Sequence, residues 1–440
     1  MPLRSRLARF LGSIGAGVVW RSSRDVKLLI LLRFVRLLGY GGTTFVLALY
    51  LSALGFCDSD VGLFMTLTLV GDLGVSFVLT YVGDGMGVRR TAVVGALLMC
   101  VGGLAFASLD NFWLLLLASI LGVINPGANE IDPFKAIEES AIARLSAPDT
   151  RGDVFAWWSM LGMLGTAASN LATGWALDAL RDRGTTQVDC YRVVFVAYAA
   201  MGLVKLACAA CLSSDVEVAA TLLPKDSDFP HPQVPHYGAT ALTAEATEAR
   251  PMFIPASLSF MRKLSLAMAF DFIGSGLAQI SWMTYFFKRE YDVAEGVLGS
   301  LTFAAGIISS VLNLASPPLA RAIGQVQTMI VCHSINSASL LMVAVPSDKH
   351  LALAIFVVRI VTREMDNAPR QAFISAGVLD RERTSAMGVV NIVKTAGLCL
   401  GLYTTGFFAG LDLFWMAFIV AGALKLVYNV LMLAFFWRRG

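Results

Sequence analysis

Residues 412–436 read DLFWMAFIVAGALKLVYNVLMLAFF, in which Lys425 is the only charged residue after the opening Asp412. A helix needs about 20 apolar residues, each rising about 1.5 Å, to cross the hydrocarbon core of a bilayer. The stretch therefore predicts a membrane-spanning helix. Eleven other apolar stretches of comparable length occur along the chain, so the fold is decided by the repetition of this pattern.

The composition of the whole chain agrees with this segment. Of the 440 residues, 57% are hydrophobic and 15% are charged, and the mean hydropathy is +0.69. Soluble domains have about 45–50% apolar and about 25% charged residues. We therefore expect an all-α polytopic membrane protein. This class excludes most nucleic-acid binders, disulfide-stapled secreted domains and soluble enzymes.

The apolar stretches predict 12 transmembrane helices in two six-helix halves, separated by a segment rich in Pro, Asp, Glu, Ala and Thr. The predicted organisation is a cytoplasmic N-terminal tail over 1–27, a first half over 28–212, a cytoplasmic linker over 213–263 and a second half over 264–437. The predicted spans are 28–52, 61–82, 91–109, 112–128, 154–177, 192–212, 264–287, 295–315, 326–345, 350–366, 386–410 and 412–436.

Lys and Arg residues are distributed unevenly between the two sides of these spans. Cytoplasmic loops carry an excess of Lys and Arg, and this excess sets the orientation of a membrane protein. Placing the N-terminus inside leaves only six of these residues in the loops on the other side, so both termini are predicted to be cytoplasmic. The six are Arg181, Arg183, Arg192, Lys288, Arg289 and Lys349. We expect the protein in the plasma membrane.

The two predicted halves resemble each other at an offset of about 236 residues or slightly less, which indicates an internal duplication. Each match is weak alone, but the matches occur in the same order in both halves. The matched pairs are Glu130 with Asp366, Pro133 with Pro369, Gly87 with Gly324 and Lys205 with Lys425.

The loop after the second predicted span carries Asp84, Gly87, Arg89 and Arg90 at the spacing Asp-x-x-Gly-x-Arg-Arg. With the 12 spans, the central linker and the parallel repeat, this loop resembles the major facilitator superfamily over nearly the whole chain. The match is partial, because Thr80, Gly85 and Val88 replace the family's first Gly and two of its Arg residues.

Four other stretches resemble a poorly characterised bacterial and fungal branch of this family. They are RFVRLLGYG at 33–41, TLTLVGD at 66–72, EIDPFKAIEE at 130–139 and MDNAPRQ at 365–371. The resemblance implies the fold and a transport function, and it implies no substrate.

Asp72 and Lys394 are charged residues at matching depth in spans two and eleven. Asp72 lies roughly 15 Å from the cytoplasmic end of its span, and a charge near the bilayer centre costs on the order of 3 kcal/mol. The family resemblance implies that these two spans face each other. We expect Asp72 and Lys394 to pair when the cytoplasmic side is closed; the alternative is a permanent buried ion pair or a polar contact to helix backbone.

Asp271 in span seven and Arg359 and Arg363 in span ten lie on helices that line the cavity in this family. The two arginines are candidates to hold an organic anion, while Asp271 would balance one of them or take a coupling proton. The alternative is a structural tie between Asp271 and Arg359 or Arg363.

The Asp84 loop is also a candidate gate. Asp84, with Arg89 or Arg90, would meet the start of span eleven near Arg383, where a carboxylate suits a helix N-terminus. This inner latch, with Gly87 in its turn, is predicted to stabilise the outward-open state.

Four remaining features have mainly structural interpretations. Arg33 and Arg36 are expected to reach the lipid headgroups; the alternative is contact with substrate. Lys205 and Lys425 are expected to share a structural role, either reaching the headgroups or tying to a neighbouring helix, rather than binding substrate. Residues 133–147 have amphipathic helical spacing. The sequence does not decide whether Cys57 and Cys190 form a disulfide.

We therefore predict a secondary-active transporter that moves a small organic molecule by alternating access, with export of a metabolite or toxic compound favoured. The alternatives are an importer of a small organic solute and a non-transporting membrane sensor. No phosphate-binding P-loop and no metalloprotease or serine-hydrolase motif occurs, so we expect no enzyme activity, no cofactor and no metal. This scheme allows the transport to be coupled to protons. We expect a monomer in the lipid bilayer that binds no nucleic acid.

Overall fold

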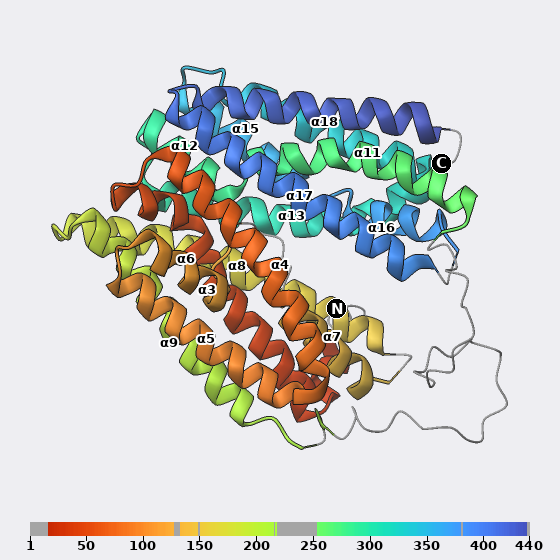
Figure 1. Ribbon diagram of the computed structural model, residues 1–440, viewed down its shortest axis with the longest axis horizontal. Helices are drawn as coiled ribbons and strands as arrows, with labels where there is room; N and C mark the ends of the chain where they lie inside the picture. Colours follow the sequence, from red (N-terminus) through yellow and green to blue (C-terminus); the bar gives the residue numbers. More distant parts are fainter. Residues whose placement is uncertain are drawn as a thin grey trace, which may run out of the picture.

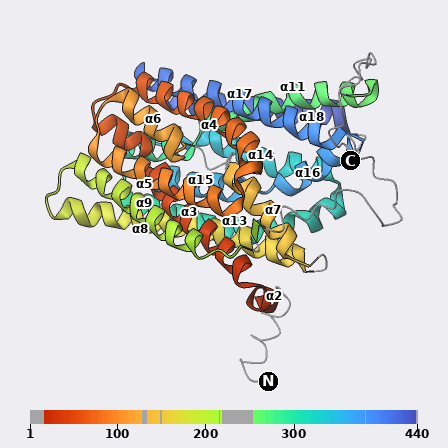
Figure 2. The ribbon, with the colours of Figure 1, turned by 60° about the horizontal axis from the view of Figure 1, so that its bottom comes forward.

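Helices form nearly all of the computed structural model, which describes residues 16–126, 133–147, 150–214, 216–217, 253–379 and 382–437. No β-strand occurs within these ranges. The first half contains α2 (Ala16–Arg21), α3 (Arg24–Ala53), α4 (Asp58–Met86), α5 (Val88–Ser108), α6 (Phe112–Gly122), α7 (Pro133–Leu145), α8 (Arg151–Asp182) and α9 (Gln187–Ala210). In Figure 2, α2 projects from the rest of the bundle towards the N-terminus.

The second half repeats this order with one interrupted span. Its helices are α11 (Pro255–Leu277), α12 (Ile280–Tyr291), α13 (Glu295–Ile323), α14 (Gln325–Val343), α15 (Lys349–Thr362), α16 (Asn367–Ala376), α17 (Arg383–Gly410) and α18 (Phe414–Phe436). The segments Ser257–Leu277 and Ile280–Tyr291 meet at a bend of 42°, so α11 and α12 together form one broken span.

The predicted all-α membrane fold in two halves is confirmed. Seven described helices are long and apolar enough to cross a bilayer, and the bent pair makes an eighth. The helix order is consistent with the 12 predicted spans. Several helix ends differ from the predicted spans by five residues or more. The helix α6 ends at Gly122 because Val123 adopts a left-handed φ of 57°, and α11 begins at Pro255, before the predicted 264, because proline suits the first turn of a helix. The helix α13 extends to Ile323, beyond the predicted 315.

The two halves meet at one end of the molecule and diverge at the other (Figure 1). We call the divergent end the linker end, because the first half finishes there after α9 and the second begins there with α11. We call the opposite end the sealed end. Across the contact, α3 packs on α12, α4 on α17 and α8 on α13.

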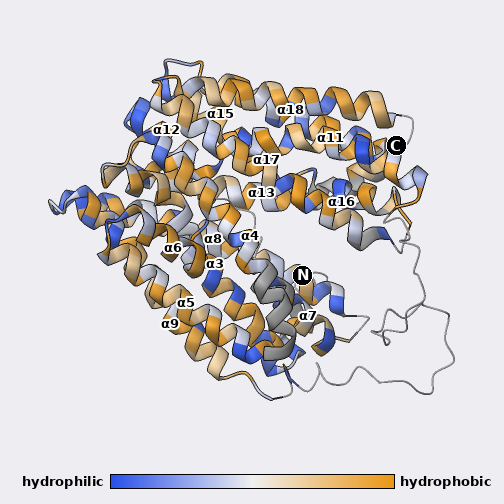
Figure 3. Ribbon diagram, viewed as in Figure 1, coloured by the Kyte–Doolittle hydropathy of each residue, from blue (hydrophilic) through white to orange (hydrophobic). Residues whose placement is uncertain are grey.

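Hydrophobic residues occur along most of the helices (Figure 3), and many large ones are exposed on the outside of the bundle. Val101 is 63% exposed, Leu203 60% and Val430 64%, on three different helices. Soluble proteins rarely leave such large contiguous apolar patches in water. These faces therefore contact lipid, and the protein is an integral, multi-pass membrane protein.

The internal repeat predicted from the sequence is visible in the backbone. Gly87 before α5 has a φ of +84°, and its partner Gly324 before α14 has a φ of +99°. Only glycine adopts such values without strain. The matched Lys205 and Lys425 are both buried, with 1% and 3% exposure.

Gly62 of α4 and Gly406 of α17 allow the two halves to touch near the sealed end. A Cβ atom at Gly406 would lie 2.6 Å from the carbonyl oxygen of Asp58 and 2.7 Å from the Cα of Gly62. Gly388, on the same helix, has no heavy atom within 4 Å of such a Cβ. A larger residue at 406 must therefore push the halves apart.

We expect Gly406→Leu to lower the melting temperature of the purified protein by several degrees, because overpacking costs about 1–3 kcal/mol. Gly388→Leu is the matched control and should stay close to wild type. Thermal unfolding in detergent measures both. An unchanged Gly406→Leu protein would contradict the close contact.

Candidate substrate site

A cavity of about 380 Å³ lies between the two halves. Its walls come from α3, α7 and α8 of the first half and from α12, α13, α15, α16 and α17 of the second. We call it the central cavity. Hydroxyl and amide groups supply much of its polar lining: Tyr40, Thr44, Thr166, Asn170, Thr302, Ser309 and Gln371.

The charged residues of the central cavity are mostly cations. Arg33 and Lys135 line it from the first half, and Arg363 and Lys394 line it from the second, against the single carboxylate of Glu364. The Nε atom of Arg363 donates to Glu364 at 2.6 Å. The cavity is therefore positively charged overall.

Arg33 and Arg36 do not reach the lipid headgroups as predicted. The guanidinium of Arg33 lies 3.6 Å from the ring centroid of Trp158 on α8, and Gly162 leaves room for it. Arg36 forms an ion pair of 2.8 Å with Glu138 of α7. The prediction was wrong because α7 and α8 cover both residues, which are only 5% and 6% exposed.

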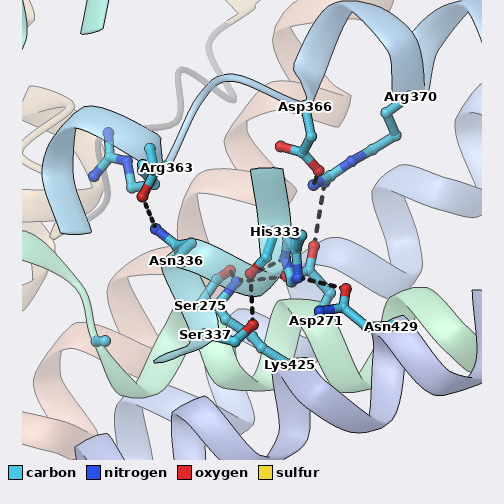
Figure 4. A network of polar contacts seen from close by, with 12 residues as sticks. Asp271, Ser275, His333, Asn336, Ser337, Arg363, Asp366, Arg370, Lys425 and Asn429 are labelled. Carbon is cyan, nitrogen blue, oxygen red and sulfur yellow. Dashed lines mark hydrogen bonds and ion pairs between the residues drawn. The ribbon is translucent and has the colours of Figure 1, made fainter. Parts of the chain in front are cut away.

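A smaller chamber of about 80 Å³ lies beside the central cavity and shares Arg363, Glu364 and Lys394 with it. Asp271 of α11 lines this chamber and is 2% exposed. Figure 4 shows Asp271, His333 of α14 and Lys425 of α18 converging here.

The carboxylate of Asp271 accepts from three side chains on three other helices. His333 Nε2 lies 2.8 Å from Asp271 Oδ1, and Lys425 Nζ contacts the same oxygen. Arg370 Nη1 of α16 lies 3.2 Å from Oδ2 and also pairs with Asp366. This arrangement bridges four helices through one carboxylate.

The structural tie considered for Asp271 is therefore made with residues other than Arg359 and Arg363. Arg359 Nη2 donates to the carbonyl oxygen of Ala278 at 3.3 Å, and Arg363 pairs with Glu364. The sequence analysis missed His333 and Arg370. Lys425 lies deep in the last span and matches Lys205 in the first half. A lysine at that depth needs a charged partner, so this position was the sequence signal for the network.

The chamber adjoins the break between α11 and α12. Ala278 and Gln279, between the two helices, line the chamber, while Ile280 lines the central cavity. The freed carbonyl of Leu277 accepts from Thr405 Oγ1 at 2.9 Å. Interrupted helices with exposed backbone ends are typical of substrate and ion sites in transporters.

Asp72 and Lys394 do not contact each other in this structure. Asn125 Nδ2 donates to Asp72 Oδ2 at 2.7 Å, and no ion pair involves Lys394 in the described part of the chain. The nearest fixed contact of their helices is the hydrogen bond from Thr66 to the carbonyl of Cys399, 3.1 Å long. Both residues lie towards the linker end from that contact, at about 9 and 7.5 Å along their helices.

Ion pairs close the sealed end between the halves, and the sequence analysis did not predict them. Arg181 of α8 binds Glu295 at the start of α13 with two hydrogen bonds of 2.6 and 2.7 Å. Tyr191 donates to the same carboxylate at 3.2 Å, and Lys288 lies 3.6 Å from it. The side chain of Glu295 is fully buried.

A second cluster closes the same end next to α4 and α12. Arg289 binds Asp58 of the other half and Asp412, each at 2.7 Å. Tyr285 also donates to Asp58, at 2.8 Å. We call these two clusters, centred on Glu295 and Asp58, the outer seal.

The predicted inner latch is only partly described. The side chains of Asp84 and Arg383 lie outside the described residues, so their contact stays a prediction. Arg90 is exposed. The backbone amide of Arg89 donates to Glu217 at 2.9 Å, at the start of the linker segment.

The open question of the cysteines is answered by their positions. Cys57 and Cys190 are both free, one exposed and one buried. The amphipathic segment forms α7 as predicted, and its Ala141 and Ile142 pack in a core beneath the first half.

The fold and the cavity define a two-half helical membrane protein of the transporter type, and the chain belongs to the Major Facilitator Superfamily, whose model matches residues 29–262. The uncharacterized membrane protein YJR124C of Saccharomyces cerevisiae is 32% identical over 431 residues, which is 94% of each chain. Membership of this family indicates a membrane transporter. Such transporters typically need no cofactor.

Solved structures share this fold at low sequence identity. A mutant of the nucleoside transporter NupG matches with a TM-score of 0.71 at 12% identity, covering 93% of this chain and 99% of that one. The D-xylose-proton symporter matches with a TM-score of 0.70 at 13% identity, covering 93% and 97%. At these identities the likeness shows the fold alone.

We expect Glu295→Gln to open the sealed end, because removing one charge of a buried ion pair costs on the order of 3 kcal/mol. The measurement is labelling of Asn170→Cys, inside the central cavity, by a membrane-impermeant maleimide added from the sealed side. Labelling should rise several-fold when Glu295→Gln is added. Asp189→Asn is the control, since Asp189 pairs with Arg192 inside one half; equal labelling in all three would contradict the seal.

Proposed function

We propose that the protein is a secondary-active transporter that moves a small organic molecule by alternating access. In this mechanism the central cavity opens to each side of the membrane in turn. The observation that carries this proposal is a polar cavity of about 380 Å³, lined by both halves and sealed at one end by ion pairs between them. Rocking of one half against the other would exchange the sealed end for an open one.

The linker end is the cytoplasmic side in this proposal. The uneven distribution of Lys and Arg supports that assignment, with both termini in the cytoplasm. The structure then corresponds to an inward-open state. We propose that the protein works as a monomer in the plasma membrane, because the scheme needs only one copy of the two halves.

Closing the cytoplasmic side would bring Asp72 and Lys394 together. Their similar offsets, in the same direction, from the contact of Thr66 with Cys399 support this pairing. Lys394 would then contact the substrate in the inward-open state and Asp72 when the cytoplasmic side is closed. The inner latch of Asp84 with Arg89 or Arg90 near Arg383, turning at Gly87, would hold the same closed state.

The coupling ion that we propose is a proton held by the Asp271 cluster. His333 Nδ1 lies 3.0 Å from Asn429 Oδ1, and its Nε2 faces Asp271 Oδ1. An imidazole with acceptor oxygens at both nitrogens donates at both only when it is protonated. Lys425 and the ring of Tyr428, on α18, and Arg370, on α16, also face this cluster. A movement of either helix would therefore change how readily the cluster holds a proton.

Export of a metabolite or toxic compound is the direction that we propose from the family resemblance, and an exported solute would enter the cavity from the linker end in the observed state. Import passes through the same state, so direction has to be measured. A non-transporting sensor with this fold is the second alternative.

We expect a solute to be depleted inside and enriched outside cells that express the wild type, compared with cells that carry an empty vector. Asp72→Asn and Lys394→Gln should each reduce this movement about tenfold, the effect of roughly 1.4 kcal/mol on the closed state. Comparison of small molecules in cells and medium measures it.

The charge-swapped double variant Asp72→Lys with Lys394→Asp should recover part of the activity. Lys349→Gln, at the sealed surface, is the matched control. Movement in the opposite direction would make the protein an importer. If all cultures match at equal membrane expression, the transport proposal is wrong and the sensor is favoured.

A pH gradient across proteoliposomes should change the transport rate of the wild type, because the cycle would carry a proton. His333→Gln keeps a hydrogen-bonding side chain but does not titrate, so its transport should lose most of this dependence. Gln327→His, which adds a histidine near the linker end of the same helix, serves as the control. Retained pH dependence in His333→Gln would remove the cluster from the coupling step.

A further inference from the structure

Two cations at the chamber have no carboxylate partner in the ranges that the structure describes. Arg359 is 2% exposed; its Nη2 atom binds the Ala278 carbonyl, and its Nε atom has no acceptor. Lys394 lines both the chamber and the central cavity, and no described side chain forms an ion pair with it. A charge at this depth in a membrane protein requires a counter-charge or a function.

The nearby carboxylates are already occupied by other cations. Asp271 accepts from His333, Lys425 and Arg370. Glu364 accepts from Arg363, its neighbour in sequence. Asp271 and Glu364 both lie near Arg359 and Lys394, but neither forms an ion pair with them among the described residues, and the cations that line the chamber outnumber its carboxylates.

We propose that the chamber receives an anionic group of the substrate, a carboxylate or a phosphate, held by Arg359 and Lys394 while the rest of the molecule lies in the central cavity. This inference rests on the proposed transport function, because it names the substrate class of the same site.

The sizes of the two spaces fit such a molecule. A site for one water needs at least about 10–15 Å³ of comparable volume, so a chamber of about 80 Å³ admits a group of several atoms. Ligand sites commonly measure about 300–1,000 Å³, and the central cavity lies in the lower part of that range. Its hydroxyl and amide lining favours a substrate body that forms hydrogen bonds.

The backbone reinforces the preference for an anion. The helix α12 begins at Ile280, and its N-cap Gln279 provides no side-chain hydrogen bond to the helix end. Gln279 lines the chamber, so the positive end of the α12 dipole lies beside it. Interrupted helices in transporters direct such ends at anionic substrate groups.

Arg359 also ties the α11–α12 break through its bond to Ala278, and that structural role uses one of its donors. A guanidinium carries five N–H groups, so donors remain for an anion. A purely structural role predicts no charge selectivity in the chamber. The test therefore measures the charge preference of the chamber directly.

The probe is a pair of thiol reagents of similar size, the anionic sulfonatoethyl and the cationic trimethylammonioethyl methanethiosulfonates. They react with Ser275→Cys, placed in the chamber, in the full-length purified protein, and mass spectrometry follows that one site. Gln279→Cys, at another chamber position, replaces it if Ser275→Cys fails to fold. Each rate is divided by the rate of the same reagent with a free thiol.

We expect the anionic reagent to react at least about tenfold faster than the cationic one, because a cleft lined by one sign of charge concentrates opposite ions by roughly 10–1,000-fold. Lys394→Gln and Arg359→Gln should each reduce this ratio several-fold. Lys349→Gln, at the sealed surface, should leave it unchanged. Equal rates, or a preference for the cationic reagent, would overturn the proposal.

A second arm separates this inference from the transport proposal. The solute found in the comparison of cells and medium is classified by charge. A transported carboxylate or phosphate supports both proposals and distinguishes the two head groups; a neutral or cationic solute supports transport and overturns the anion site. If no solute moves, transport fails, while the reagent rates still decide whether the chamber selects anions.

Discussion

A charge buried among apolar helices has to be neutralised by a group on another helix, and this constraint shapes the second half of the protein. Asp271 is held by His333, Arg370 and Lys425, which come from three different helices. Each of these contacts would leave an uncompensated charge if its helix moved away, at a cost of several kcal/mol. The network therefore fixes the packing of α11, α14, α16 and α18 around the chamber.

The first half has a charged tie on the equivalent helices, with a different charge pattern. Arg36 on α3 forms an ion pair with Glu138 on α7, and the buried Lys205 on α9 interacts electrostatically with both. In the second half the equivalent helices carry Asp271, Arg370 and Lys425. The duplication thus preserved the need for a charged tie between a first span, a short helix and a last span, while the residues that form it diverged.

The broken span connects this network to the contact between the halves. At the start of α12, Ser281 donates to the carbonyl of Thr44 at 2.6 Å, and Thr284 donates to that of Phe45 at 2.9 Å. The same break places Ala278 and Gln279 at the chamber. The break therefore touches both the first half and the chamber, so the proposed movement of one half against the other would change the surroundings of the chamber directly.

The sequence by itself determined the membrane class, the helical fold in two halves and the position of the internal repeat, because apolar length and glycine in special turns are local properties. The family resemblance also led us to expect Arg359 and Arg363 at a cavity, and both residues line the chamber together with Lys394. Only the tertiary structure decided which charges meet: Asp271 with His333 and Arg370, Arg33 with Trp158, and Glu295 with Arg181. Such pairs join residues distant in sequence, so their partners depend on how the helices pack in three dimensions.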